Sequence, residues 1–566
     1  MKLKLAIILW LICGLSPGLS ACADPGEAWR QDVDSLLEVF DGDDRPGLVV
    51  AIERNGEVVF AEGYGMADLE HGIPITPESV FHVASVSKQF TAFSIALLEE
   101  EGRVDADADI RTYLAFMPDY GVVVRVRHLI HHTSGLRSFG DLFVLGGHDM
   151  EDSWHHGQVL NLLRRQTGLD FQPGTEHSYN NSGYALLAEI VSSVTGQSLR
   201  EFTRERIFEP LSMDHTFVGD ETGEIIPGRA LAYVQIPGVN GAPEWQRSLL
   251  NFDTIGSTGL KTTALDLLKW GHNFSEPTVG TPELIEKLSQ PGQLENGALV
   301  NYGYGLAVWT VAGHRAIRHS GSEAGYRAVI THFPESDVTI VMLANTPIDL
   351  GGLTEDVAQI YLGEGHEPEG EGDPAIVQGN LEQIEAITGV YQPEFGRMIS
   401  LENQSGRLTW NVESWEPVEL VFREDGSFEQ GGRRYWEYFT PVFDASRNVT
   451  GLTQHTDPDM TVFIPRVDTV WHPGPAELEA FTGDFYCADV DQTYSFSIVD
   501  GQLVASSLWS DPVVLKPSIS DRFDGAWPLN SVVFDRDDEG MVMGLHVHSG
   551  RVRNMWFEKV SADDPS

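Results

Sequence analysis

The chain has 566 residues, and 37 lysines and arginines face 84 aspartates and glutamates, which gives a formal net charge of −47 at pH 7. The length indicates about two to four domains, and an apolar content of 42% is enough to fill sizeable cores. Such a negative charge argues against nucleic acid as a partner and opposes contact with anionic membrane surfaces.

The first 23 residues have the pattern of a secretory signal. Two lysines precede an apolar run that is shorter than a membrane-spanning helix. Ala21 and Ala23 fit a cleavage site, whereas Leu19–Cys22 also resembles a lipobox in which Cys22 carries a lipid. We therefore expect an exported protein, periplasmic or secreted, that contacts a membrane only through such an anchor. Beyond this segment only Cys487 remains, which excludes an intramolecular disulfide.

Strand and helix patterns follow in an order that indicates one mixed domain. Residues 47–65 alternate around Asn55-Gly56, a dipeptide that favours a type I′ hairpin turn. A helix pattern from about Ser85 to Glu101 ends at Gly102. Further helix patterns lie at 126–130, 182–195 and 198–207, strand patterns at 304–311, 315–319, 328–333 and 338–343, and a last helix pattern at 353–362. We predict an α/β domain over 24–362, in which an antiparallel sheet built from both ends is flanked by helices and encloses a helical subdomain.

The composition changes after residue 362. Glycine, proline and acidic residues fill 363–374, which is typical of an exposed linker and which we extend to 363–378. A weak internal repeat follows, because Glu385–Tyr391 matches Glu479–Phe485. Both copies carry short alternating strands, which predicts two antiparallel β-barrels at 379–472 and 473–566. We interpret the barrels as scaffold, with a ligand-carrying role as the alternative.

The first motif with chemical potential is Ser85-x-x-Lys88. Residues three apart on a helix face the same way, so the hydroxyl and the amine would lie side by side near a helix N-terminus. Lys88 must lose a proton to act as a base, and burial or a second cation would lower its pKa from about 10.4 toward neutrality. The alternative is a helix cap beside a solvated lysine, against which the apolar neighbours Val83, Val86 and Phe90 argue.

Two further motifs follow in chain order. Tyr179 and Asn181 lie just before a helix that we expect Ser182 to cap. Tyr179 could carry a proton if Lys88 depressed its pKa. The segment His319-Ser320-Gly321-Ser322 lies at a strand end, where the glycine would allow a substrate backbone to approach closely. Each motif alone is explained as well by packing, and it is their combination and order that favour a catalytic site.

Together these motifs resemble the serine β-lactamase and penicillin-binding-protein superfamily, in particular its class C-like branch. Supporting matches are His132–Leu136, Ile207–Met213 and Gly256–Leu260, and the resemblance covers roughly residues 30–362. The two barrels resemble the lipocalin-like domains that follow the catalytic domain in D-aminopeptidases of this branch.

The resemblance implies a role for each motif residue. Ser85 would be the acylated nucleophile and Lys88 its activating partner. Tyr179 would pass a proton to the leaving group and later help water to attack. Asn181 would hold Lys88 or the substrate, and the backbone N–H groups of Ser85 and Ser322 would form the oxyanion hole. The reaction would be acyl transfer to Ser85 followed by hydrolysis, without a metal or a cofactor.

One departure from the family pattern narrows the expected activity. His319 begins the third motif in place of lysine, and a mostly neutral imidazole recognises a substrate carboxylate poorly. We therefore expect a D-aminopeptidase-like peptidase or an esterase that acts on a small peptide, amide or ester. β-Lactamase or D,D-carboxypeptidase activity is one alternative, and a module that binds a cell-wall peptide or lipid without turnover is another. Glu323 could recognise a free α-amine or could be a surface glutamate.

Overall fold

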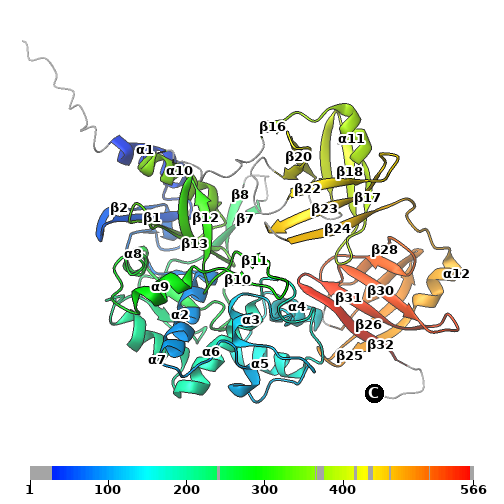
Figure 1. Ribbon diagram of the computed structural model, residues 1–566, viewed down its shortest axis with the longest axis horizontal. Helices are drawn as coiled ribbons and strands as arrows, with labels where there is room; N and C mark the ends of the chain where they lie inside the picture. Colours follow the sequence, from blue (N-terminus) through cyan, green and yellow to red (C-terminus); the bar gives the residue numbers. More distant parts are fainter. Residues whose placement is uncertain are drawn as a thin grey trace, which may run out of the picture.

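The computed structural model describes residues 28–238, 243–363, 365, 375–412, 417–430, 438–457, 460–508 and 510–560. The expected signal with Cys22 and most of the expected linker lie outside these ranges. The described chain forms the predicted α/β domain followed by two antiparallel barrels (Figure 1). Among the helices in these ranges, none combines the length and apolar character needed to cross a membrane.

A six-stranded antiparallel sheet forms the centre of the first domain, in the order β12-β13-β14-β15-β1-β2. Its strands are β1 Leu48–Arg54, β2 Glu57–Tyr64, β12 Ala307–Val311, β13 His314–Glu323, β14 Tyr326–Phe333 and β15 Val338–Ala344. Leu48 pairs with Ala344 in β15, so the sheet joins both ends of the domain, as predicted. Asn55 and Gly56 have φ angles of 51° and 78°, which confirms the type I′ turn.

Helices cover both faces of this sheet. Alternate residues of β1 show the two layers, since side chains on a strand point to opposite faces. Leu48, Val50 and Ile52 belong to one apolar cluster with α1 (Ala28–Leu37) and α10 (Leu350–Leu362). Val49 and Ala51 belong to a second cluster with α8 (Ala264–His272) and the helical subdomain. The catalytic motifs lie on the side of the second cluster.

The insert between β2 and β12 is the predicted helical subdomain. Its helices are α2 Ser87–Glu100, α3 Val126–Ile130, α4 Phe139–Leu145, α5 His156–Arg165, α6 Asn181–Thr195, α7 Leu199–Thr203 and α9 Pro282–Leu288. Short strands connect them: β3 Met66–Asp68, β4 Ile73–Pro74, β5 Phe81–His82, β6 Phe217–Val218, β7 Tyr233–Pro237, β8 Pro243–Arg247, β9 Leu260–Thr262, β10 Gly292–Gln293 and β11 Leu299–Val300.

The cap of α6 differs from the prediction. The side-chain oxygen of Asn180 accepts a hydrogen bond from the Gly183 N–H at 3.0 Å and caps the helix. Ser182 lies inside the first turn, where its hydroxyl donates to the Arg137 carbonyl at 2.7 Å. Asparagine and serine are equally good N-cap residues, so the sequence could not separate the two.

Both barrels have eight strands. The strands of the first are β17 Gly389–Tyr391, β18 Ile399–Gln404, β19 Arg407–Asn411, β20 Val418–Arg423, β21 Phe428–Gln430, β22 Tyr438–Phe443, β23 Val449–Asp457 and β24 Met460–Val467. Pairing of β20 with β21 closes this ring, and β16 (Ile376–Val377) adds to β20. The strands of the second are β25 Gly483–Cys487, β26 Gln492–Val499, β27 Gln502–Ser506, β28 Val513–Pro517, β29 Arg522–Asp524, β30 Ser531–Arg536, β31 Val542–Ser549 and β32 Val552–Lys559.

The internal repeat corresponds to equivalent positions in the two barrels. In the first copy α11 (Leu381–Ile387) leads into β17, and in the second a helical turn at 479–481, preceded by α12 (Pro475–Leu478), leads into β25. Each repeat segment therefore carries the chain from a short helix into the first strand of its barrel.

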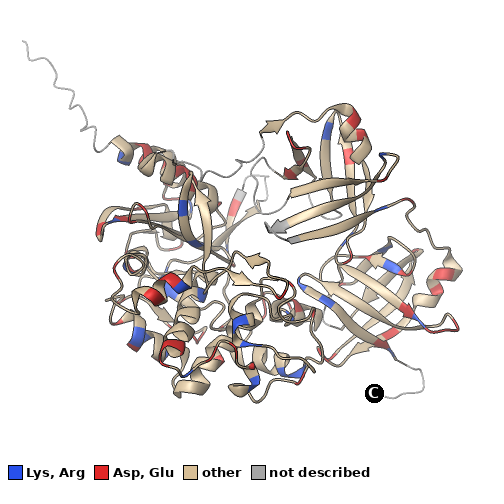
Figure 2. Ribbon diagram, viewed as in Figure 1, with Lys and Arg blue, Asp and Glu red and all other residues tan. Residues whose placement is uncertain are grey.

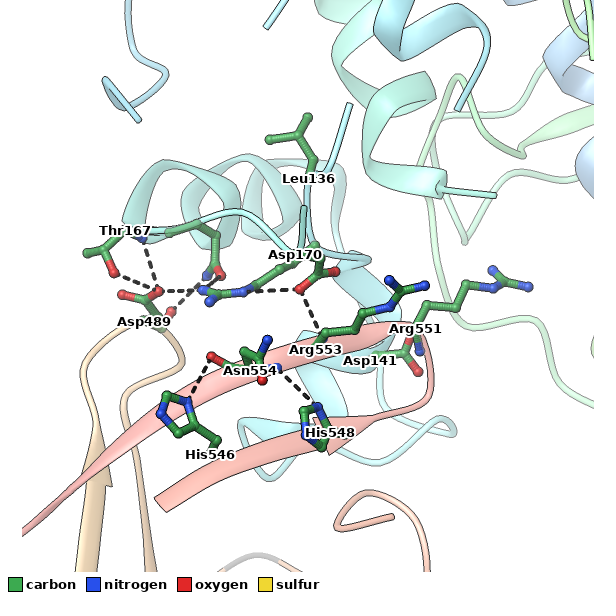
Figure 3. Close-up of polar contacts among 12 residues, drawn as sticks. Leu136, Asp141, Thr167, Asp170, Asp489, His546, His548, Arg551, Arg553 and Asn554 are labelled. Carbon is green, nitrogen blue, oxygen red and sulfur yellow. Dashed lines mark hydrogen bonds and ion pairs between the residues drawn. The ribbon is translucent and has the colours of Figure 1, made fainter. Parts of the chain in front are cut away.

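The second barrel docks on the helical subdomain through buried charged groups. The Asp489 carboxylate accepts from Arg137 at 2.8 Å, and both side chains are less than a tenth exposed. The Thr167 N–H and hydroxyl donate to the same carboxylate at 3.0 and 3.1 Å. On the last hairpin, the Arg553 N–H donates to Asp170 at 2.9 Å (Figure 3). The apolar cores of this barrel and of the first domain are continuous, whereas the first barrel has a core of its own.

Replacing Asp489 should weaken this docking. Asp489→Ala leaves the buried Arg137 guanidinium without its closest carboxylate, and we expect the free energy of unfolding to fall by about 3 kcal/mol, as measured by urea denaturation. Asp491→Ala is the control, because its ion pair with Arg165 spans 3.8 Å on exposed side chains, and it should cost less than about 1 kcal/mol. Equal effects of the two substitutions would contradict the docking role.

Candidate active site

Ser85 lies in a tight turn that links β5 to α2. Residues 84–86 form a 3-10 turn, and α2 begins only at Ser87, two residues later than predicted. Ala84 has a φ of 47°, a left-handed conformation that is costly for a residue other than glycine and that is typical of functional sites. The turn places the half-buried Ser85 hydroxyl beside the first turn of α2.

Lys88 lies directly beneath Ser85 and has no exposed surface. Its Nζ atom is 3.1 Å from Ser85 Oγ and donates to the Ser257 carbonyl at 2.7 Å. Burial holds the pKa of Lys88 well below its usual value; the charge of Glu323 opposes this shift and that of Arg551 adds to it. A neutral amine that donates to Ser257 keeps its lone pair for the Ser85 proton.

Tyr179 lies against the same amine, with its ring centroid 4.8 Å from Lys88 Nζ. Burial raises the pKa of Tyr179 above its usual value, although a hydrogen bond with the Ser85 side chain lowers it. The expected depression of the Tyr179 pKa by Lys88 is therefore wrong, because burial of the phenol raises this pKa. The phenol retains its proton and can donate it.

His319 lies in β13 with 8% of its surface exposed. Its Nδ1 donates to the Ser320 carbonyl at 2.6 Å, and its Nε2 accepts from the Tyr302 hydroxyl at 2.8 Å. Burial is the main cause that lowers the pKa of His319 to about 3. These two bonds fix one neutral tautomer, so the imidazole supplies no positive charge at neutral pH.

Gly321 brings β13 against the turn that carries Ser85. A β-carbon at this position would lie 2.2 Å from the Val83 carbonyl oxygen and 3.1 Å from the Ser85 nitrogen. Gly321 is therefore needed for the close packing of β13 against residues 83–85, in addition to any approach of a substrate. Ser322, the next residue, is exposed on the same strand, and the oxyanion role of its N–H stays a prediction.

Asn181 does not make the contact with Lys88 that the resemblance gave as one alternative, and its contact with a substrate stays a prediction. Its buried Oδ1 atom has no hydrogen-bond partner among the described residues, so it does not accept a bond from Lys88. An unpaired buried oxygen is costly, and it remains available to a donor on a substrate.

Glu323 is part of the site and not an open surface residue. Its side chain is 17% exposed, and its carboxylate accepts from His82 Nε2 and from the Thr258 hydroxyl. Burial would raise its pKa, but the charge and hydrogen bond of His82, the bond from Thr258 and the charge of Lys261 outweigh burial and lower it. The site thus holds an ionised carboxylate whose charge raises the pKa of Lys88 and so opposes the effect of burial.

Tyr302 and Arg551 are site residues that the sequence motifs do not contain. Arg551 lies in the turn between β31 and β32 of the second barrel, and its guanidinium carbon is 5.2 Å from the centroid of the Tyr179 ring. The second barrel therefore contributes a residue to the surroundings of Tyr179. Neither residue has a motif of its own, and the contact of Arg551 spans most of the chain, so local patterns contain no signal for it.

Comparisons with known proteins agree with this geometry. The family model described as Beta-lactamase matches residues 33–362. The chain belongs to the beta-lactamase family and is a serine hydrolase. A D-aminopeptidase of Gluconobacter oxydans is 28% identical over 542 residues, which cover 91% of this chain and 96% of the relative. A D-aminopeptidase of Brucella anthropi is 26% identical over 537 residues, with 91% and 95% covered.

Solved structures share the fold. The octameric penicillin-binding protein homologue of Pyrococcus abyssi has a TM-score of 0.53 at 22% identity, over 77% of this chain and 98% of its own. The D-amino acid amidase of Ochrobactrum anthropi SV3 has a TM-score of 0.50 at 22% identity, over 59% and 98%. The two D-aminopeptidases match over 91% of this chain, so that similarity extends over the barrels as well as the catalytic domain.

A side chain at Gly321 should damage the site. Gly321→Ala puts a β-carbon against the Val83 carbonyl, and we expect a loss of about 1 to 3 kcal/mol of stability together with most of the hydrolytic activity, because β13 must move away from Ser85. Gly157→Ala is the control, since a β-carbon there meets nothing within 4 Å. Full activity of Gly321→Ala would show that the close approach is not required.

Proposed function

We propose that the protein is an exported peptidase of the D-aminopeptidase type, which releases an N-terminal D-residue from a small peptide or amide through an acyl-enzyme on Ser85. The observation that carries the proposal is the fully buried Lys88 amine 3.1 Å from the Ser85 hydroxyl, where burial holds the pKa of Lys88 well below its usual value. The full-length match to two D-aminopeptidases supports the substrate class.

Acylation begins with proton transfer from Ser85 to the Lys88 lone pair. Ser85 Oγ attacks the acyl carbon, and the carbonyl oxygen becomes an oxyanion that the N–H groups of Ser85 and Ser322 stabilise. When the intermediate collapses, the bond to the leaving nitrogen breaks. Tyr179 gives the leaving amine its proton and recovers one from Lys88, so that both groups return to their neutral forms.

Deacylation repeats these steps with water as the nucleophile. Water attacks the ester carbon and loses a proton toward Tyr179 and Lys88, and Ser85 Oγ leaves with a proton. The products are the free D-amino acid and regenerated Ser85. Short acyl esters can form the same intermediate, so an esterase activity belongs to the same proposal.

Recognition of a free α-amine is assigned to Glu323. Its ionised carboxylate lies in the site, and His82 and Thr258 fix its orientation. The neutral His319 does not provide the cation that attracts the carboxylate of a β-lactam. Both features favour an aminopeptidase over a β-lactamase, and Asn181 Oδ1 offers a further acceptor for the substrate.

A substrate panel tests the proposal. We expect hydrolysis of D-Ala-p-nitroanilide at a higher kcat/KM than L-Ala-p-nitroanilide or nitrocefin, and a loss of about a thousandfold or more in Ser85→Ala because the nucleophile is absent. Ser193→Ala, an exposed serine on α6, is the matched control and should retain full activity. A preference for nitrocefin, or activity that survives Ser85→Ala, would overturn the proposal.

A further inference from the structure

Arg551 is a cation that the turn between β31 and β32 carries into the active site. The last hairpin of the second barrel lies against the helical subdomain (Figure 3). Beyond the 5.2 Å approach to the Tyr179 ring, the charge of Arg551 acts on Lys88, Tyr179 and His132. The charge of one barrel residue thus lowers the pKa of three side chains in the first domain.

The turn that holds Arg551 is rigidly fixed. The Gly550 N–H donates to Asn530 Oδ1 at 2.8 Å, and the Arg551 N–H donates to Asp141 Oδ2 at 3.3 Å. Gly550 has a φ of 53°, and a β-carbon there would lie 2.0 Å from Asp141 Oδ1, so a larger residue would displace the Asp141 side chain that holds the turn. These bonds hold the backbone of the turn beside α4, and the Arg551 guanidinium extends from there to the Tyr179 ring.

The guanidinium of Arg551 has no ion pair with a carboxylate in the described part of the chain, and the side chain is exposed. This is unusual in a protein with 84 acidic residues, which are spread over all three domains (Figure 2). The Asp141 carboxylate accepts a hydrogen bond from the backbone N–H of Arg551. This bond leaves the five N–H donors of the Arg551 guanidinium available. A guanidinium pairs two of these donors with one carboxylate in a fixed geometry.

We infer that Arg551 binds a carboxylate on the leaving-group side of the substrate, so that the favoured substrates are short peptides with a free C-terminus. The inference rests on the proposed function, in which Tyr179 protonates the leaving amine, because a cation against the Tyr179 ring lies next to the leaving residue. Glu323 and Arg551 then recognise the two opposite charges of a dipeptide. The barrel residue supplies the cation that His319 does not.

The matched substrates D-Ala-Gly and D-Ala-glycinamide test this, since they differ only in a terminal carboxylate against a neutral carboxamide. We expect wild type to favour D-Ala-Gly by about 10- to 100-fold in kcat/KM, and Arg551→Gln to reduce this ratio to near one. Arg551→Lys should keep part of this preference, because the lysine ammonium retains the positive charge but lacks the two parallel N–H donors of the guanidinium. Arg536→Gln, which removes an arginine paired with Asp521 at 2.7 Å elsewhere on the barrel, should keep all of it.

The ratio separates recognition from chemistry, because a change in the pKa of Lys88 or Tyr179 affects both substrates equally. Product inhibition of wild type gives an independent measurement, and glycine should inhibit more strongly than glycinamide. Equal kcat/KM for the two substrates in wild type, or an unchanged ratio in Arg551→Gln, would overturn the inference while the proposed function stands. Failure of wild type to hydrolyse either substrate would overturn the proposed function instead.

Discussion

The complete burial of Lys88 is the constraint on which the site depends. Every residue from Ser87 to Leu98 in α2 is buried, so the amine enters an interior where a charged ammonium would cost several kcal/mol. Burial therefore favours the neutral amine, which donates to the Ser257 carbonyl and lies 3.1 Å from Ser85 Oγ. The same burial that stabilises the helix therefore supplies a base beside Ser85.

Two of the groups around Lys88 are also held in uncharged forms. Tyr179 retains its proton because burial raises its pKa. His319 is fixed as a neutral tautomer by Tyr302 and by the Ser320 carbonyl. Two charged groups that act on Lys88 are Glu323 and Arg551, which are more than 200 residues apart in the sequence. In the proposed mechanism, catalysis uses the neutral groups and substrate recognition uses the two charged ones.

Much of this arrangement could be predicted from the sequence, because it depends on local patterns. Alternation and turn chemistry predicted the β1–β2 hairpin, and helical periodicity predicted α2 and α6. The order of Ser85, Lys88, Tyr179 and His319 predicted that these residues meet, and the structure brings them together.

The remainder depends on contacts between distant segments. The pKa of Tyr179 is set by burial that no local motif encodes, and Gly321 is required by the chain's own backbone at Val83. Arg551 reaches the site because the second barrel docks on the helical subdomain through contacts such as the Asp489–Arg137 ion pair and the Arg553–Asp170 hydrogen bond. Glu323 could be named as a candidate from the sequence, but its burial between His82 and Thr258 could not be predicted.

The central claim is that Lys88 is neutral in the resting protein, and a titration of its side chain tests this directly. Only six lysines follow residue 23, so an NMR spectrum of protein labelled at the lysine ε-carbons is simple enough to assign with Lys88→Met and Lys261→Met. We predict that Lys88 titrates far below the exposed lysines, and also apart from Lys261, whose pKa is lowered mainly by burial to about 8. A Lys88 resonance that titrates with the exposed lysines, near pH about 10.4, would contradict the account.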